Sequence, residues 1–212
     1  GYLGHNSEIF KYGFDVEKAK QILEAAGWKV PTDGGLRRKG NLELAFTITT
    51  VDQPEYLTTL DILKSSWEAL GARVETKIVS STEAKTSIIK PRDYEALLFG
   101  EIVGIDPDPY PFWHSTQTKH PGLNLAISSD EDVDRLLEEA RQTNDLEQRR
   151  VKYLNFQNIL AEKVPAIFLY NPLYTYAMTK DMKGVGSTYI TVPSDRFERI
   201  HEWYIKTKRS FR

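Results

Sequence analysis

Residues 42–79, LELAFTITTVDQPEYLTTLDILKSSWEALGARVETKIV, decide the fold class of this chain. Apolar residues alternate with other residues over 42–48, which is typical of a half-buried strand. From Pro54 they recur at helical spacing until Gly71, which ends the expected helix. A second strand is expected over 73–79. Strand, helix and strand in so short a span predict a βαβ unit with parallel strands and a right-handed crossover.

On the N-terminal side, the apolar stripe between Asp15 and Ala26 predicts a helix that Asp15 caps and that ends at Gly27. The following residues, 31–40, are rich in glycine and charge, and we expect a solvated connector there. Three consecutive basic residues, 37–39, lie in this connector with no aromatic residue nearby. They indicate a solvated turn rather than a phosphate site.

Downstream, local patterns predict further elements and no linker that would divide the chain. The apolar run 96–99 predicts a central strand covered on both faces. We expect a helix over 82–90, a strand over 94–100, helices from about 129 and 144, strands over 166–170 and 174–178, and a helix in the tail from 194. The sequence therefore predicts one α/β domain.

Composition excludes several classes of function. The 28 Lys and Arg residues nearly balance the 30 Asp and Glu residues, so neither nucleic acid nor an anionic membrane is expected as the main partner. The absence of cysteine excludes disulfides, thiolate metal sites and cysteine nucleophiles. The chain shows no apolar run long enough for a membrane helix, no signal peptide pattern and no initiator Met before Gly1. We expect a fragment of a longer protein.

The most unusual segment is the proline-rich run 101–125, which is long for a structureless loop in a compact domain. It places Asp106, Asp108 and several aromatic residues, Trp113 among them, after an expected buried strand. Ligands of open α/β sheets gather at the carboxyl ends of strands, so this loop is a candidate binding site for a peptide or a sugar. A structural loop packed by its own aromatic residues is the alternative.

Other candidate chemistry is weaker. Asp106 and Asp108 match a D-x-D pattern, which leaves open a metal-dependent sugar-nucleotide transferase. His114 and His120 share the loop and leave open a cation site for nickel uptake. No hydrolase nucleophile motif is present. Trp28 lies at a helix end and is expected in the core, as is Trp67 on an apolar helix stripe.

The order of the segments over about 12–186 resembles the C-terminal lobe of family 5 extracellular solute-binding proteins, the peptide, nickel and oligosaccharide receptors of ABC importers. Residues 14–28 are similar to the family's D-x-x-K-A-K-x-L-L-x-E-A-G-W helix, and Leu70-Gly71 stands at its W-x-x-L-G-I-x-V junction. The Gly104–Trp113 stretch resembles its D-P-D-P loop, and Val133–Ala140 its V-D-x-L-L-x-x-A helix.

This resemblance implies an α/β, periplasmic-binding-protein-like lobe with a mixed, mostly parallel sheet flanked by helices. Residues 1–212 would form the C-terminal lobe of a two-lobe receptor whose N-terminal lobe is missing. The receptor would be a periplasmic or extracytoplasmic protein without enzymatic activity or cofactor, membrane-associated in the parent protein. It would deliver a peptide or a similar small solute to an ABC permease, and thus meet the membrane only indirectly.

Carried over residue by residue, the resemblance places the ligand cleft around the end of the strand at Gly100 and along the loop that follows. Stacking and apolar contacts are expected from the aromatic residues, and orienting contacts from the polar ones. In peptide receptors of the family an Asp on this loop pairs with the ligand's α-amino group, but here residues 101–104 replace an aromatic residue at the strand end. The expected ligand-binding residues are Glu101, Asp106, Asp108, Tyr110, Phe112, Trp113 and Asn124.

Overall fold

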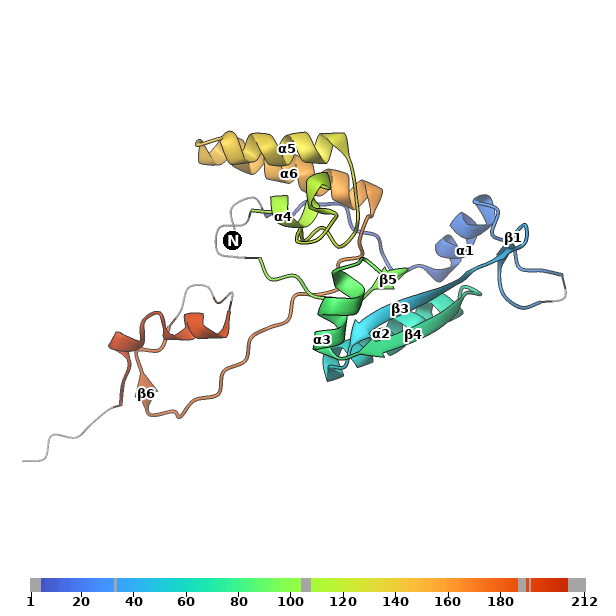
Figure 1. Cartoon of the computed structure of the whole chain (residues 1–212). Helices are drawn as coiled ribbons and strands as arrows, with labels where there is room; N and C mark the ends of the chain where they lie inside the picture. Colours follow the sequence, from blue (N-terminus) through green and yellow to red (C-terminus); the bar gives the residue numbers. More distant parts are fainter. Residues whose placement is uncertain (1–4, 33, 104–107, 187–189, 191, 206–212) are drawn as a thin grey trace, which may run out of the picture.

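A three-stranded parallel sheet forms one layer of the structure, a computed structural model that describes residues 5–32, 34–103, 108–186, 190 and 192–205 (Figure 1). Strand β3 (Ala45–Val51) lies in the middle, between β4 (Arg73–Val79) and β5 (Ala96–Leu97). The helix α2 (Pro54–Glu68) connects β3 to β4. The two strands pair in parallel along their whole length. The predicted βαβ unit is confirmed.

The helix α2 packs its apolar stripe on the sheet. Leu60, from the middle of the helix, is among its best buried side chains. Trp67 and Phe46 of β3 meet edge to face with ring centroids 5.3 Å apart, so the expected core position of Trp67 is confirmed. The buried members of this cluster are Ile48, Leu60, Ala72, Val74 and Leu98. Apolar burial therefore fixes the helix on the sheet.

At the N-terminal side, α1 (Val16–Ala25) is capped by the Asp15 carboxylate, which accepts a 2.8 Å hydrogen bond from the Lys18 amide. Gly27 follows with φ of +89°, a left-handed conformation that glycine adopts without strain. The connector then forms a small antiparallel pair, β1 (Arg38–Lys39) with β2 (Leu42–Glu43). Helix, cap and C-terminal glycine agree with the sequence prediction.

The connector is not solvated throughout, because Arg37 is only 2% exposed. Its Nε donates to the Leu70 carbonyl at 2.7 Å and its Nη1 to the Trp28 carbonyl at 2.9 Å. The guanidinium also lies 3.3 Å from the Glu24 carboxylate. Arg37 thus joins the ends of α1 and α2, and the predicted solvated turn is wrong for this residue.

The strand β5 is shorter than predicted and lies at the edge of the sheet, so the expectation of a central strand is wrong. Between β4 and β5 the chain forms α3 (Ser81–Glu83) and the π-helix η1 (Ala84–Ile89). Ile88 of η1 packs with Val51 and Val79 in a second buried cluster. Helix η1 thus covers the carboxyl end of the sheet.

A helical layer lies next to the sheet (Figure 1). It contains α4 (Tyr110–Trp113), the 3₁₀ turn η2 (Ser115–Gln117), α5 (Glu131–Gln142) and α6 (Leu146–Lys163). The long helices α5 and α6 pack side by side. Their shared core consists of Trp113, Val133, Leu136, Leu137, Phe156 and Leu160. The apolar stripe predicted for α5 is confirmed.

After α6 the structure departs most from the predictions. Residues 164–179, all of them described, form no helix or strand, and Leu173 is 94% exposed. The tail contains the 3₁₀ turns η3 (Pro193–Phe197) and η4 (Ile200–Glu202) in place of a helix, and 206–212 lie outside the described residues. Strands β6 (Met182–Lys183) and β7 (Tyr204–Ile205) pair apart from the sheet (Figure 1).

In the part of the chain that the structure describes, no helix has the length and apolarity to cross a membrane.

Candidate functional site

The expected site begins where β5 ends. The Leu98 amide donates to the Thr49 carbonyl at 2.9 Å, and Thr50 Oγ1 donates to the Leu98 carbonyl at 2.9 Å. These bonds hold the chain against β3 at Leu98. At Gly100, two positions further on, a Cβ would stand 2.7 Å from the Tyr56 hydroxyl. A larger residue at this position would have to displace the Tyr56 side chain. Tyr56, whose pKa is raised chiefly by burial, was not among the predicted site residues.

Glu101 follows directly and keeps contact with solvent. The surrounding protein nevertheless reduces the solvation of its carboxylate and raises its pKa from 4.5 to about 7. Near neutral pH the group therefore exchanges between its charged and its neutral form. Asp106, the next expected site residue, lies outside the described residues.

Asp108 is described, and its carboxylate has partners within the chain. Its Oδ2 accepts from Arg141 Nε at 3.0 Å and from Arg141 Nη2 at 2.6 Å. Its Oδ1 accepts from the Tyr110 amide at 3.1 Å. The guanidinium of α5 thus holds the carboxylate that precedes α4.

The three aromatic residues of α4 differ in their surroundings. Tyr110 is half-buried between the Arg141 guanidinium, 3.8 Å from its ring centroid, and the His114 ring, which stacks on it at 4.1 Å. Phe112 is also half-buried and lies against the core of α5 and α6. Trp113 is 7% exposed and belongs to that core. Its side chain therefore anchors α4 to α5 and α6 and presents little surface to solvent.

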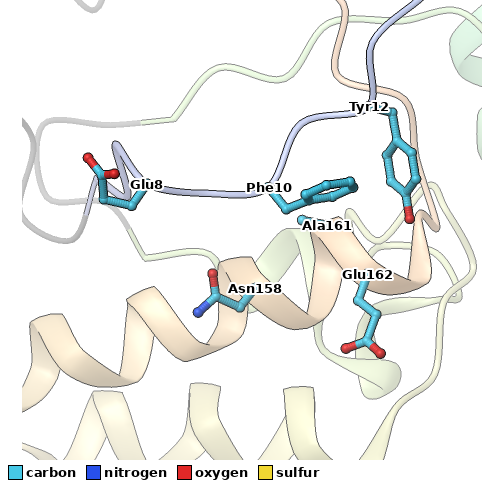
Figure 2. Close-up of a pocket in the computed structure, with 6 residues that line it drawn as sticks. All are labelled: Glu8, Phe10, Tyr12, Asn158, Ala161 and Glu162. Carbon is cyan, nitrogen blue, oxygen red and sulfur yellow. The ribbon is translucent and has the colours of Figure 1, made fainter. Parts of the chain in front are cut away.

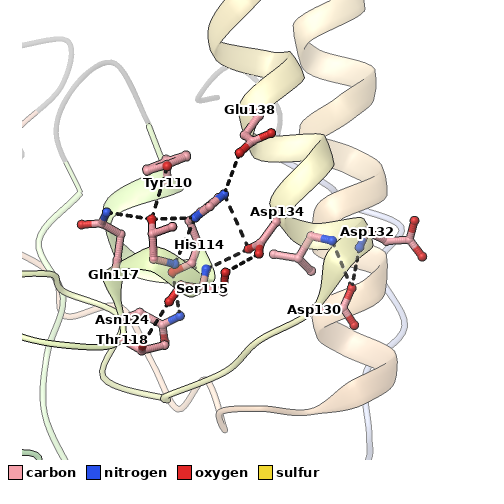
Figure 3. A network of polar contacts seen from close by, with 12 residues as sticks. Tyr110, His114, Ser115, Gln117, Thr118, Asn124, Asp130, Asp132, Asp134 and Glu138 are labelled. Carbon is pink, nitrogen blue, oxygen red and sulfur yellow. Dashed lines mark hydrogen bonds and ion pairs between the residues drawn. The ribbon is translucent and has the colours of Figure 1, made fainter.

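His114 is 3% exposed and lies in a polar network between α4 and α5 (Figure 3). Its Nδ1 accepts from the Thr116 amide at 3.2 Å, so in the neutral ring the proton is on Nε2. Nε2 can then donate to Glu138 Oε1 at 3.2 Å. Asp134 accepts from the Ser115 amide at 2.8 Å and from the Ser115 hydroxyl. The network ties the end of α4 to α5.

Asn124 has no exposed surface. Its Nδ2 donates to the carbonyls of His114 at 3.1 Å and Ser128 at 2.9 Å, and its Oδ1 accepts from the Ser128 amide at 3.3 Å. In this conformation Asn124 braces the loop from inside and offers no surface on which a ligand could rest.

Two further residues, both absent from the sequence prediction, attach the loop to the sheet region. Arg92 donates from Nε to the Thr118 carbonyl at 2.9 Å and from Nη2 to the Gly122 carbonyl at 2.6 Å. Tyr94 donates from its hydroxyl to the Leu125 carbonyl at 2.6 Å. No local pattern in the sequence identifies these contacts, because the partners are separated by at least 26 positions.

An open hollow lies elsewhere, between the N-terminal segment and α6 (Figure 2). None of the predicted site residues lines it. Its lining residues are Glu8, Phe10, Tyr12, Asn158, Ala161 and Glu162.

The described residues give no support to a metal centre. Within the segments from 5 to 205 that the structure describes, no three His, Cys, Asp or Glu side chains form a group that could hold a metal ion. His114 is engaged by Thr116 and Glu138, and His120 lies exposed.

Comparison with known proteins gives concordant results. A family model described as bacterial extracellular solute-binding proteins, family 5 Middle, matches residues 1–123. The oligopeptide-binding protein AppA of Bacillus subtilis is 27% identical over 200 residues, which are 93% of this chain and 36% of AppA. The structure of AppA in complex with a nonapeptide matches 97% of this chain and 41% of that one, with a TM-score of 0.80 and 26% identity.

A second solved structure, NikZ from Campylobacter jejuni in complex with Ni(L-His), matches 93% of this chain and 41% of its own, with a TM-score of 0.74 and 27% identity. The chain thus spans somewhat more than a third of the length of these relatives. The comparisons do not support the sugar-nucleotide transferase based on Asp106 and Asp108. Because the family model covers more than half of the sequence, the chain belongs to the bacterial extracellular solute-binding proteins of family 5.

Proposed function

We propose that residues 1–212 are the C-terminal ligand-binding lobe of a receptor for peptides or a similar small solute. The observation that carries this proposal is the match of nearly the whole chain to AppA, a receptor solved with a nonapeptide. The share of AppA that this chain covers supports the view that another lobe completes the ligand cleft.

The same family membership supports a receptor without enzymatic activity or cofactor. Such a receptor works outside the cytoplasm, in the periplasm or attached to the outer face of the membrane, and passes its ligand to an ABC permease. It contacts the membrane through that permease and does not bind nucleic acid.

The site offers chemistry that suits a peptide. The half-buried Phe112 side chain provides apolar surface, and Glu101 provides a carboxylate for a cationic group of the ligand. Tyr110 would contribute through the edge of its ring, because Arg141 and His114 cover its faces. Because the pKa of Glu101 is raised to about 7, an ammonium group that pairs with it would favour the charged form. Asp108 would contribute mainly through the loop that it holds in place. Asp106 stays a predicted contact.

The test is titration calorimetry of the receptor that joins this chain to its second lobe, with a nonapeptide pool and, separately, with Ni(L-His). We expect heat with the peptides and a lower affinity for Glu101→Gln. Glu83→Gln, a change at an exposed carboxylate on α3, should leave the affinity unchanged. A two-lobe receptor that is folded by circular dichroism and binds no peptide would refute the proposal. Heat from Ni(L-His) alone would assign the chain a nickel-complex ligand instead.

A further inference from the structure

Helix α5 presents two faces with different chemistry. Its apolar residues, with Leu136 and Leu137 at the centre, face the core shared with α6. Asp134, Glu138 and Arg141 are spaced by four and three positions and therefore lie on one face of the helix. All three contact α4 or the residues that flank it. This polar stripe of α5, defined by these three residues, is the surface against which residues 108–115 rest.

Helix α4 needs such support, because one turn of helix is too short to be stable alone. Its C-terminal end has several anchors. Trp113 is buried in the core, His114 bonds to Glu138, and Ser115 bonds to Asp134.

At the N-terminal end of α4, the described contacts with α5 come from Arg141. Arg141 uses the edge of its guanidinium to bind Asp108 and the face of the same group to cover the Tyr110 ring. Asp108 in turn accepts from the Tyr110 amide. Arg141 thus contacts both the carboxylate and one face of the ring, which a planar, always charged group can do and a lysine ammonium cannot. The His114 ring stacks on the same tyrosine.

We propose that Arg141 is a positioning residue for the segment 108–115. It fixes Asp108 and Tyr110 and thereby sets the affinity for ligand, without contacting the ligand itself. Only the effect on ligand affinity rests on the proposed function. The fixing of Asp108 and Tyr110 can be measured with no ligand present.

The first measurement is amide hydrogen exchange by NMR on the ligand-free chain. In Arg141→Gln we expect the Tyr110 and Phe112 amides to exchange about tenfold faster, and in Arg141→Lys about threefold faster, because the ion pair remains without the planar stacking. The matched control is Arg135→Gln on the same helix, since Arg135 pairs only with Asp132 and Glu139 of α5 in the contacts described. The amides of α6 should be unchanged in all three variants.

Equal exchange at Tyr110 and Phe112 in wild type and Arg141→Gln would overturn the proposal. So would a uniform increase across α5 and α6, which would show a general stabilising role instead.

The second measurement is peptide affinity by calorimetry of the receptor that contains both lobes. We expect Arg141→Gln to weaken binding by about tenfold, Arg141→Lys to restore part of it, and Arg135→Gln to have no effect. Faster exchange with unchanged affinity would refute the link between this loop and the ligand. Absence of peptide binding by the wild-type two-lobe receptor would refute the proposed function, while the exchange result would still decide whether Arg141 positions residues 108–115.

Discussion

Asn124 offers the sharpest test of how the loop is built, since the family resemblance predicts a ligand contact and the structure shows a buried brace. We consider Asn124→Ala. The substitution removes three hydrogen bonds and leaves the carbonyls of His114 and Ser128 and the Ser128 amide without this partner. A buried polar group that loses its partner costs about 1–3 kcal/mol.

The three lost bonds therefore predict a decrease of about 3 kcal/mol in the free energy of unfolding, after partial relaxation of the loop. Urea unfolding followed by circular dichroism measures this change. Asn144→Ala is the control, because Asn144 is exposed between α5 and α6. We expect the control to change stability by less than about 0.5 kcal/mol.

A ligand-contacting asparagine would behave in the opposite way. Its replacement would weaken peptide binding and leave the unfolding free energy nearly unchanged. If Asn124→Ala lost less than about 1 kcal/mol of stability while peptide binding was abolished, the assignment of Asn124 as a brace would be refuted.

Two further predictions concern Arg37 in the connector and Glu101 at the start of the run 101–125. Arg37→Met should lower the free energy of unfolding by about 2–4 kcal/mol, because it leaves the Leu70 and Trp28 carbonyls without their donor. The control Arg38→Met, at the exposed neighbour, should cost less than about 1 kcal/mol. Equal effects of the two substitutions in thermal melts would contradict the buried role of Arg37. The pKa of Glu101 is raised on folding from 4.5 to about 7, so the native state holds the proton more tightly and this group lowers stability as pH rises through that window. Glu101→Gln should accordingly be more stable than wild type at pH 8 and equal to it at pH 4, and a pH-independent difference would refute this account.

Local patterns predicted much of the first two thirds of the fold. Alternation over β3, helical spacing over α2 and the glycine at position 71 specify the βαβ unit, because each pattern needs only neighbouring residues. The family resemblance was likewise visible in the order of short motifs. The strands expected over 166–170 and 174–178 failed for a physical reason. Alternation makes a segment suitable for a strand, but a strand forms only with a hydrogen-bonded partner, and no described segment pairs with these residues.

The sequence also predicted which loop carries the candidate site, but not the role of each residue in it. Asp108 and Arg141 lie 33 positions apart, and their pairing follows from the packing of α5 beside α4. Nothing local distinguishes Arg37 from its exposed basic neighbours.

By itself, then, the sequence determined the α/β class, the βαβ unit, the family and the segment where a ligand is expected, since these depend on short-range periodicity and on motif order. Only the tertiary structure decided which of the predicted residues remain accessible. Burial and hydrogen-bond partners depend on contacts between distant segments, and these contacts place Asn124 and Trp113 inside while leaving Glu101 in contact with solvent.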